Sequence, residues 1–122
     1  MAEFVTCRQG RNLMSYTPKR GDIVWIDFDP SAGHEQAHHR PALVLSPEPF
    51  NKQIQLALVA PITSRVIGHG FEVAVDTDKT KGVVLCQQVK TIDYAARDVK
   101  YIEKAPVAVL NEVLAKVRVL VS

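Results

Sequence analysis

The residues best suited to chemistry lie between Gly33 and Pro41, where the sequence reads Gly-His-Glu-Gln-Ala-His-His-Arg-Pro. This stretch brings together the carboxylate of Glu35, several imidazoles and the guanidinium of Arg40. When RNA is cut by its own 2′-hydroxyl, the phosphorane that forms carries extra negative charge, and a fixed arginine can pair with its oxygens while staying charged. Arg40 is therefore the first candidate for a catalytic group. On composition alone, an arginine in a surface ion pair is the simpler explanation.

Metal-dependent chemistry has weaker support. His34 and His38 would share one face only if their segment were helical, and we expect a loop there. Asp27 and Asp29 could form a carboxylate pair on a strand, but Asp29 precedes Pro30 and more simply begins a turn. The sequence also has no phosphate-cradling glycine loop, no GxSxG or HExxH motif and no Cys/His zinc spacing. We therefore expect neither a metal nor a cofactor.

Neither of the two cysteines is expected to act as a nucleophile. Cys7 and Cys86 are far apart and form no CxxC pair. Cys86 ends the apolar run Gly-Val-Val-Leu-Cys, whereas a catalytic thiol needs an electropositive, partly exposed setting. We interpret Cys86 as a small buried hydrophobic residue.

The elements that would hold these residues are mostly strands. Runs rich in β-branched, aromatic and other apolar residues predict strands at residues 22–28, 40–45, 55–62, 71–75 and 83–89. The polar residues 31–39 predict an exposed loop that leads into the second strand, and loops on a rigid sheet often carry chemistry. Residues 46–52 predict a turn or one short helical turn, and residues 63–70 and 76–82 predict loops.

The periodicity changes near the C-terminus. After Pro106, apolar residues recur at spacings of three and four, which predicts an amphipathic helix with Pro106 in its first turn. Short strands followed by one packed helix predict a mainly β fold with α, a small and partly closed barrel. Residues 1–16 show no periodicity and predict a loosely ordered N-terminal extension, which leaves residues 17–122 as the single folded domain.

Length and charge limit the possible functions. The chain has 122 residues, 47% hydrophobic and 23% charged, which is typical of one folded, soluble domain. Lysine and arginine number 15 against 13 acidic residues, so any phosphate binding must be local and a protein that coats nucleic acid is disfavoured. The sequence contains neither an apolar run of the about 20 residues that a spanning helix needs nor the apolar core of a signal peptide. We therefore expect a cytoplasmic protein.

Residues 21–47 resemble the N-terminal signature of the MazF/PemK toxins of type II toxin–antitoxin systems. That signature reads roughly G-D-hydrophobic-W, then D-P-G-x-E-Q and H-R-P-A-hydrophobic-V-L-S. The similarity continues through Pro-Ile-Thr-Ser at 61–64, Phe-Glu-Val at 71–73 and Gly-Val-Val-Leu-Cys-Gln-Gln-Val-Lys-Thr-Ile-Asp at 82–93. It covers the chain from about Tyr16 to the C-terminus.

The resemblance implies an SH3-like small β-barrel of the CcdB/PemK kind that forms a homodimer. It also implies a sequence-specific, metal-independent endoribonuclease that cuts single-stranded RNA, mRNA above all, and so arrests translation and growth. The products would carry 2′,3′-cyclic phosphate and 5′-hydroxyl ends. A cognate MazE-like antitoxin would hold the enzyme inactive.

The resemblance also assigns roles to individual residues. Arg40 would be the catalytic arginine, Thr63 would position the scissile phosphate through its hydroxyl, and Glu35 would support catalysis or substrate binding from the loop. His39 is a candidate for a supporting, proton-transferring group because imidazole titrates near neutrality. The general base is not identified.

Further contacts with RNA are predicted from residue type alone. Phe50, Lys52 and Arg65 would line an RNA groove through stacking and phosphate contacts, although scattered surface residues would look the same. Trp25 lies in an apolar strand and is predicted to be a core residue rather than a platform for bases.

Two alternatives belong to other functional classes. A CcdB-like toxin of the same fold binds DNA gyrase and cuts nothing, but that function depends on a C-terminal Trp-Gly-Ile that this chain lacks. A plain SH3-like interaction module would carry Arg40 and Glu35 only incidentally.

Overall fold

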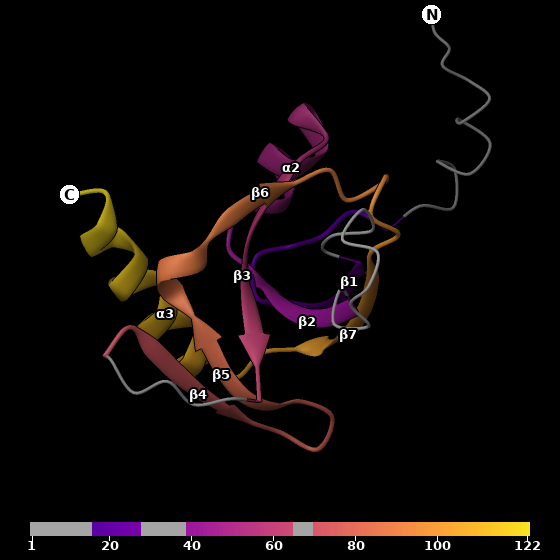
Figure 1. Cartoon of the computed structure of the whole chain (residues 1–122). Coiled ribbons are helices and arrows are strands. Elements are labelled where there is room, and N and C mark those ends of the chain that lie inside the picture. Colours follow the sequence, from indigo (N-terminus) through magenta and orange to yellow (C-terminus); the bar gives the residue numbers. More distant parts are fainter. Residues whose placement is uncertain (1–15, 28–38, 65–69) are drawn as a thin grey trace, which may run out of the picture.

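In the computed structural model of the protein, residues 16–27, 39–64 and 70–122 are described. In these residues seven strands form one curled antiparallel sheet in the order β4-β5-β3-β2-β1-β7, with β6 paired to β3 (Figure 1). The elements are β1 (Asp22–Asp27), β2 (His39–Val44), α2 (Glu48–Ile54), β3 (Ala57–Thr63), β4 (Glu72–Asp76), β5 (Lys81–Leu85), a 3-10 turn (Cys86–Gln88), β6 (Lys90–Ile92), β7 (Lys100–Lys104) and α3 (Val107–Leu120).

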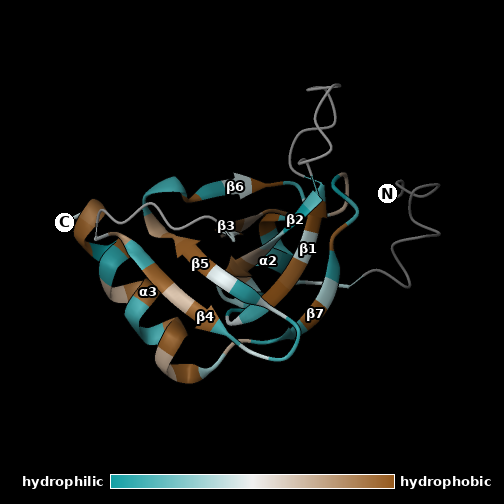
Figure 2. Cartoon of the chain, turned by 60° about the horizontal axis from the view of Figure 1, so that its bottom comes forward, coloured by the Kyte–Doolittle hydropathy of each residue, from teal (hydrophilic) through white to brown (hydrophobic). Residues whose placement is uncertain are grey.

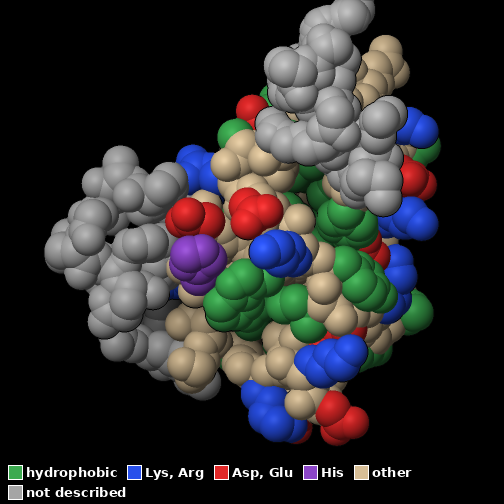
Figure 3. All heavy atoms as spheres, turned by 90° about the vertical axis from the view of Figure 1, so that its right-hand side faces the viewer, with side chains coloured by type: hydrophobic (Ala, Val, Ile, Leu, Met, Phe, Trp, Pro, Cys, Tyr) green, Lys and Arg blue, Asp and Glu red, His purple; other side chains and the backbone are tan. Residues whose placement is uncertain are grey.

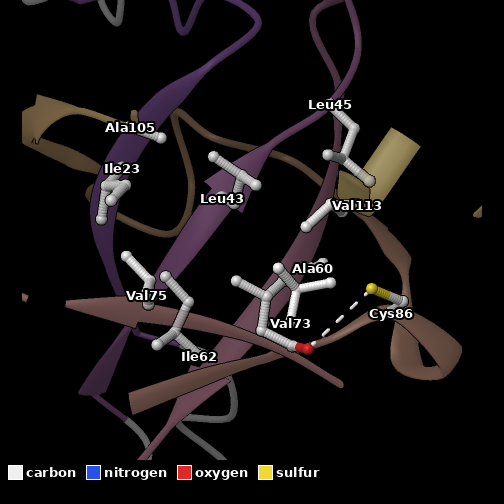
Figure 4. Packing of buried hydrophobic residues seen from close by; sticks show 11 residues of the cluster. Ile23, Leu43, Leu45, Ala60, Ile62, Val73, Val75, Cys86, Ala105 and Val113 are labelled. Carbon is white, nitrogen blue, oxygen red and sulfur yellow. Dashed lines mark hydrogen bonds between the residues drawn. The ribbon is translucent and has the colours of Figure 1, made fainter. Parts of the chain in front are cut away.

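The central strands are buried on both faces of the sheet. Ile23 and Leu43 belong to a cluster that packs beneath α3. Val24 and Val44 belong to a second cluster, which also contains Tyr94. Figure 4 shows the first cluster, in which side chains from several strands face Val113 of α3. Burial on both faces explains why the first two strand sequences are almost continuously apolar.

Helix α3 covers one side of the sheet with its apolar stripe. Val113 is fully buried, while Leu110, Leu114 and Val117 are partly buried against the same cluster. Hydrophobic and hydrophilic residues alternate around this helix (Figure 2), and Pro106 immediately precedes it. The predicted amphipathic helix is confirmed, as is the mainly β fold class. No helix in the described residues is both long enough and apolar enough to cross a membrane.

Three details differ from the sequence prediction. The strand expected over 83–89 ends at Leu85 and continues as a 3-10 turn, and the turn or short helical turn expected at 46–52 is the helix α2, which extends to Ile54. Strands β6 and β7 were not predicted. β6 has three residues, of which one is lysine, and β7 begins and ends with lysine at the end of the sheet order, so both lack the apolar alternation on which strand prediction depends.

Asp22, buried at the beginning of β1, binds both the residues that precede β1 and the end of β7. Its carboxylate accepts hydrogen bonds from the Tyr16 hydroxyl, the Lys19 amide at 3.1 Å and the Lys104 ammonium at 2.6 Å. Burial and the neighbouring carboxylate raise the pKa of Tyr16, which keeps its hydroxyl protonated as a donor. Residues 1–15 of the predicted extension lie outside the described residues.

Candidate active site

The candidate site forms where strand β3 changes partners. Strand β2 pairs with Val59 to Pro61 of β3, whereas β5 pairs with Ile62 and Thr63. Arg40 and Thr63 lie two residues beyond the pair Ala42↔Pro61 along their strands, so the same register points Arg40 toward Thr63. The sheet topology therefore brings together two residues that are 23 positions apart in the sequence.

A hollow of about 250 Å³ opens at this place. We call it the Arg40 hollow; it is lined by His39, Arg40, Pro41, Ile62, Thr63, Ser64 and Lys81. Arg40 is partly buried, and no carboxylate of the described residues forms an ion pair with its guanidinium. A guanidinium placed in such a hollow by strand geometry suits an anion such as a phosphate.

Gly82 allows β5 to approach Thr63. A Cβ atom at this glycine would lie 2.3 Å from the Thr63 carbonyl oxygen, which is far inside van der Waals contact. Glycine is therefore required here so that β3 and β5 can pair at the edge of the hollow. Sequence reasoning missed this role, because it places Gly82 in a loop.

His39 connects the hollow with the surface of β1. Its ring stacks on Trp25, with ring centroids 6.3 Å apart and an interplanar angle of 17°, and its Nε2 lies 4.0 Å from Asp27 Oδ2. The predicted core position of Trp25 is wrong, since the side chain is 41% exposed. Trp25 shares a strand face with buried Ile23, but the cluster that covers Ile23 does not extend over it.

Lys81 is a lining residue that sequence reasoning missed. Its ammonium lies 2.8 Å from Asp76 Oδ1 and 2.9 Å from the Thr77 carbonyl oxygen, at the exposed turn between β4 and β5. Lys81 reaches the Arg40 hollow because β5 pairs with β3. A lysine in a polar run such as residues 76–82 carries no local signal of that pairing.

Of the remaining predicted site residues, the structure describes Phe50 and Lys52, and neither lines the Arg40 hollow. Glu35 and Arg65 lie outside the described residues. Phe50 and Lys52 lie on α2, and Phe50 lines a second hollow of about 470 Å³. We call this second hollow the α2–α3 groove; it is lined by Arg20, Leu45, Ser46, Pro47, Phe50, Leu58, Leu114, Val117, Arg118 and Val121.

The described residues hold no group of three or more His, Cys, Asp or Glu side chains that could bind a metal ion. Cys86 is fully buried in the cluster beneath α3, as predicted, and burial raises the pKa of its thiol to about 11. Its sulfur approaches the Val84 carbonyl oxygen at 3.9 Å (Figure 4). A protonated, buried thiol agrees with a packing role.

Comparison with known proteins identifies the family. Residues 19–121 match the family described as "PemK-like, MazF-like toxin of type II toxin-antitoxin system". The chain belongs to this family. The endoribonuclease toxin MazF of Escherichia coli K12 is 43% identical to this PemK/MazF-type chain over 108 residues, which cover 87% of this chain and 96% of that one.

Solved structures of family members agree with the fold. The crystal structure of MazF from Deinococcus radiodurans matches with a TM-score of 0.79 and 41% identity, covering 88% of this chain and 98% of that one. A MazE-MazF crystal structure from the same organism matches with a TM-score of 0.77 and 35% identity, covering 88% and 97%. The predicted PemK/MazF resemblance is thereby confirmed.

Proposed function

We propose that the protein is the toxin of a toxin–antitoxin pair and acts as an endoribonuclease on single-stranded RNA, with mRNA as its main target. The observation that carries this proposal is the Arg40 hollow, in which a partly buried arginine without a carboxylate partner in the described residues faces the end of β3 at Thr63. The related MazF of Escherichia coli, an endoribonuclease, supports the same activity here.

The proposed reaction uses the RNA as its own nucleophile. The 2′-hydroxyl attacks the adjacent phosphorus, the bond from phosphorus to the 5′-oxygen breaks, and the products are a 2′,3′-cyclic phosphate and a 5′-hydroxyl. One proton leaves the 2′-oxygen and one reaches the departing 5′-oxygen. Arg40 stabilises the phosphorane charge, Thr63 positions the phosphate, and His39 supports proton transfer from the rim of the hollow. None of these steps needs a metal.

Residues outside the Arg40 hollow are proposed to bind the rest of the RNA strand. Glu35 supports catalysis or substrate binding, while Arg65, Lys52 and Phe50 contact nucleotides farther along the strand. Phe50 is 47% exposed on α2, which leaves its ring available for stacking. Lys52 is an exposed cation on the same helix and suits a phosphate contact.

The protein is further proposed to act in the cytoplasm as a homodimer and to be inhibited by a MazE-like antitoxin. The large apolar side chains exposed on α2 and at the end of α3, among them Ile54, Val119 and Val121, support burial against another protein chain. The similar MazE-MazF structure supports an antitoxin of the MazE type. We also propose residues 17–122 as the toxin domain and residues 1–16 as an extension of it.

The decisive test is incubation of the purified protein with a long single-stranded RNA in excess EDTA, followed by mapping of the cut sites and analysis of the new ends. We expect discrete cuts at one short sequence, with cyclic phosphate and 5′-hydroxyl ends. An Arg40→Ala preparation, purified in the same way, controls for contaminating nucleases. Cutting that requires added Mg²⁺, or 5′-phosphate products, would contradict the proposed mechanism.

Complete absence of cutting by a folded protein would favour the other functional classes. Inhibition of DNA gyrase supercoiling would then indicate a CcdB-like toxin. Inactivity in both assays would indicate a protein-interaction module.

A further inference from the structure

The proposed reaction gives Trp25 no role. This residue is flanked in β1 by Val24 and Ile26, which are both fully buried, yet its own side chain is 41% exposed. Burial of an aromatic side chain is strongly favourable, so an indole left at the surface of a rigid strand is typical of a binding site. It is the single tryptophan of the chain.

The neighbours of Trp25 make a flat surface of mixed character. Lys100 of β7 and Pro41 of β2 lie directly opposite Trp25 in the sheet, and cross-strand partners share a face. His39, the only histidine of the described residues, stacks on the indole. We call Trp25, His39 and Lys100 the Trp25 platform. Figure 3 shows this side, where the imidazole lies against hydrophobic surface with basic and acidic side chains around it.

The Trp25 platform is continuous with the Arg40 hollow. His39 stacks on Trp25 and also lines the hollow, and Pro41 both pairs with Trp25 and lines the hollow. A polynucleotide with a phosphate in the Arg40 hollow would therefore reach the indole within its neighbouring nucleotides.

We propose that the Trp25 platform is a stacking subsite for a nucleobase that neighbours the scissile phosphate, with Lys100 beside an adjacent phosphate. This inference rests on the proposed ribonuclease function. An indole stacks on any base, and single-stranded nucleic-acid sites combine such rings with cations. The subsite therefore adds affinity rather than base selectivity.

The charges around the Trp25 platform determine whether the base or the phosphate of a nucleotide lies over it. Asp27, 4.0 Å from His39, repels phosphate, so the base and not the backbone covers the Trp25–His39 stack. The Lys100 ammonium lies 3.5 Å from Asp98, and both side chains are largely exposed. Exposed ion pairs of this kind contribute little, so a phosphate can displace Asp98 at low cost.

The intrinsic fluorescence of the single tryptophan tests the subsite without any cleavage. The probe is a single-stranded 2′-O-methyl RNA, which lacks the attacking hydroxyl, and an abasic oligonucleotide of equal length and charge is its control. We expect the 2′-O-methyl RNA to quench Trp25 emission in a saturable way and the abasic strand to leave it nearly unchanged. Equal responses to the two strands, or no response at binding saturation measured by anisotropy, would overturn the proposal.

Substitutions test the same site through kinetics. Trp25→Ala should raise the KM for long RNA about 5- to 150-fold with little change in kcat, because base stacking contributes that much affinity. Trp25→Phe should restore most of the affinity. Tyr101→Ala is the matched control, since this exposed aromatic residue alternates with Lys100 along β7, packs on Tyr16 and should leave KM unchanged.

The possible failures can be separated. If wild-type protein cuts no RNA but the 2′-O-methyl strand still quenches Trp25, the proposed function fails and the subsite stands. If wild type cuts RNA and Trp25→Ala has an unchanged KM, the subsite is disproved. If Trp25→Ala weakens only antitoxin binding, or only the oligomer measured by light scattering, the platform is a protein-contact surface and the proposal is wrong.

Discussion

The Arg40 hollow and the α2–α3 groove differ in the residues that line them and in the elements that form them. The Arg40 hollow lies at strand ends and is rimmed by Arg40, Lys81, Thr63 and His39. The α2–α3 groove is nearly twice as large, and most of its lining is apolar, from residues such as Leu114 and Val117, with arginines at its border. Strand register places residues of the first, whereas the second is lined by residues of both helices and of the sheet, such as Phe50, Leu114 and Leu58.

The Arg40 hollow is suited to binding phosphate, whereas the α2–α3 groove is suited to burying apolar surface. An arginine fixed by strand pairing is pre-organised, so its charge needs little rearrangement when a phosphorane forms. An apolar groove stabilises a complex by removing surface from water, and it selects partners by shape rather than charge. Substitutions in the two hollows should therefore change different measurements.

Arg40→Ala should have the largest effect on cleavage. Removal of one fixed donor to a developing oxyanion lowers kcat about 100- to 1000-fold, and we expect a loss at or above that range. The melting temperature should stay nearly unchanged, because Arg40 is a partly exposed residue without an ion-pair partner in the described part of the chain. Single-turnover cleavage of a mapped RNA site, together with thermal unfolding, measures both quantities.

Arg118→Ala is the matched control for Arg40→Ala. Arg118 carries the same charged group but lines the α2–α3 groove. It should leave kcat within about twofold of wild type, as expected for a substitution remote from the reacting atoms. Equal kcat losses in the two variants would mean that net charge, and not the Arg40 hollow, governs cleavage.

The sequence predicted part of this site and could not predict the rest. Arg40 and Thr63 are identified through motifs in continuous segments, Gly33–Pro41 and Pro61–Ser64. Lys81 and Gly82 escape sequence reasoning, because their importance depends on β5 pairing with β3 and no feature of a polar loop sequence reports such a long-range pairing. Trp25 was misplaced for a related reason. An apolar strand sequence shows which residues share a face, but it does not show which of those residues the neighbouring elements bury.

Gly82→Ala should produce the next largest effect, on both stability and activity. The added methyl would lie 2.3 Å from the Thr63 carbonyl oxygen, so β3 or β5 must shift. We expect a loss of about 2–4 kcal/mol in the free energy of unfolding, and about a tenfold lower kcat because Thr63 is displaced. Urea denaturation and cleavage of the same RNA measure the two losses.

Gly70→Ala separates the clash at Gly82 from backbone strain alone. Gly70 also has a positive φ, of 91°, but among the described residues no atom lies within 4 Å of the place that an added methyl group would occupy. Gly70→Ala should lower the free energy of unfolding by about 1 kcal/mol and leave kcat unchanged. If Gly70→Ala lowers kcat as much as Gly82→Ala, close approach to Thr63 is not the cause.

The α2 residues should have smaller, purely binding effects. Phe50→Ala and Lys52→Ala should each raise the KM for long RNA about three- to tenfold and leave kcat unchanged, since they contact nucleotides away from the scissile bond. KM measured against RNA length checks this, because the effect should vanish with short substrates. If Phe50→Ala instead changes the oligomeric state, the α2–α3 groove binds protein rather than RNA.

The fold was more predictable than the site because its main strands are buried on two faces. Strands β1, β2 and β3 have apolar residues in both clusters, and α3 has a clear apolar stripe, so local pattern and tertiary burial agree. Strands β6 and β7 contribute few apolar residues to these clusters, Ile92 and Ile102, and their pairing with β3 and β1 is not evident from local sequence.

Substitution of Cys86 should have the smallest effect on activity, although the residue follows β5 directly. Its thiol is buried with a pKa of about 11, raised from 9.0, so the native protein should resist iodoacetamide at pH 8 in a Cys7→Ser background and react only after unfolding. Because the raised pKa favours the protonated thiol in the folded state, this contribution to stability is complete below pH 9 and is lost as the pH rises toward 11. Cys86→Ala should remove that alkaline loss and leave kcat unchanged, since Cys86 is fully buried and does not line the Arg40 hollow. Rapid alkylation of Cys86 in the native protein, together with loss of RNA cleavage, would instead show that Cys86 belongs to the active site.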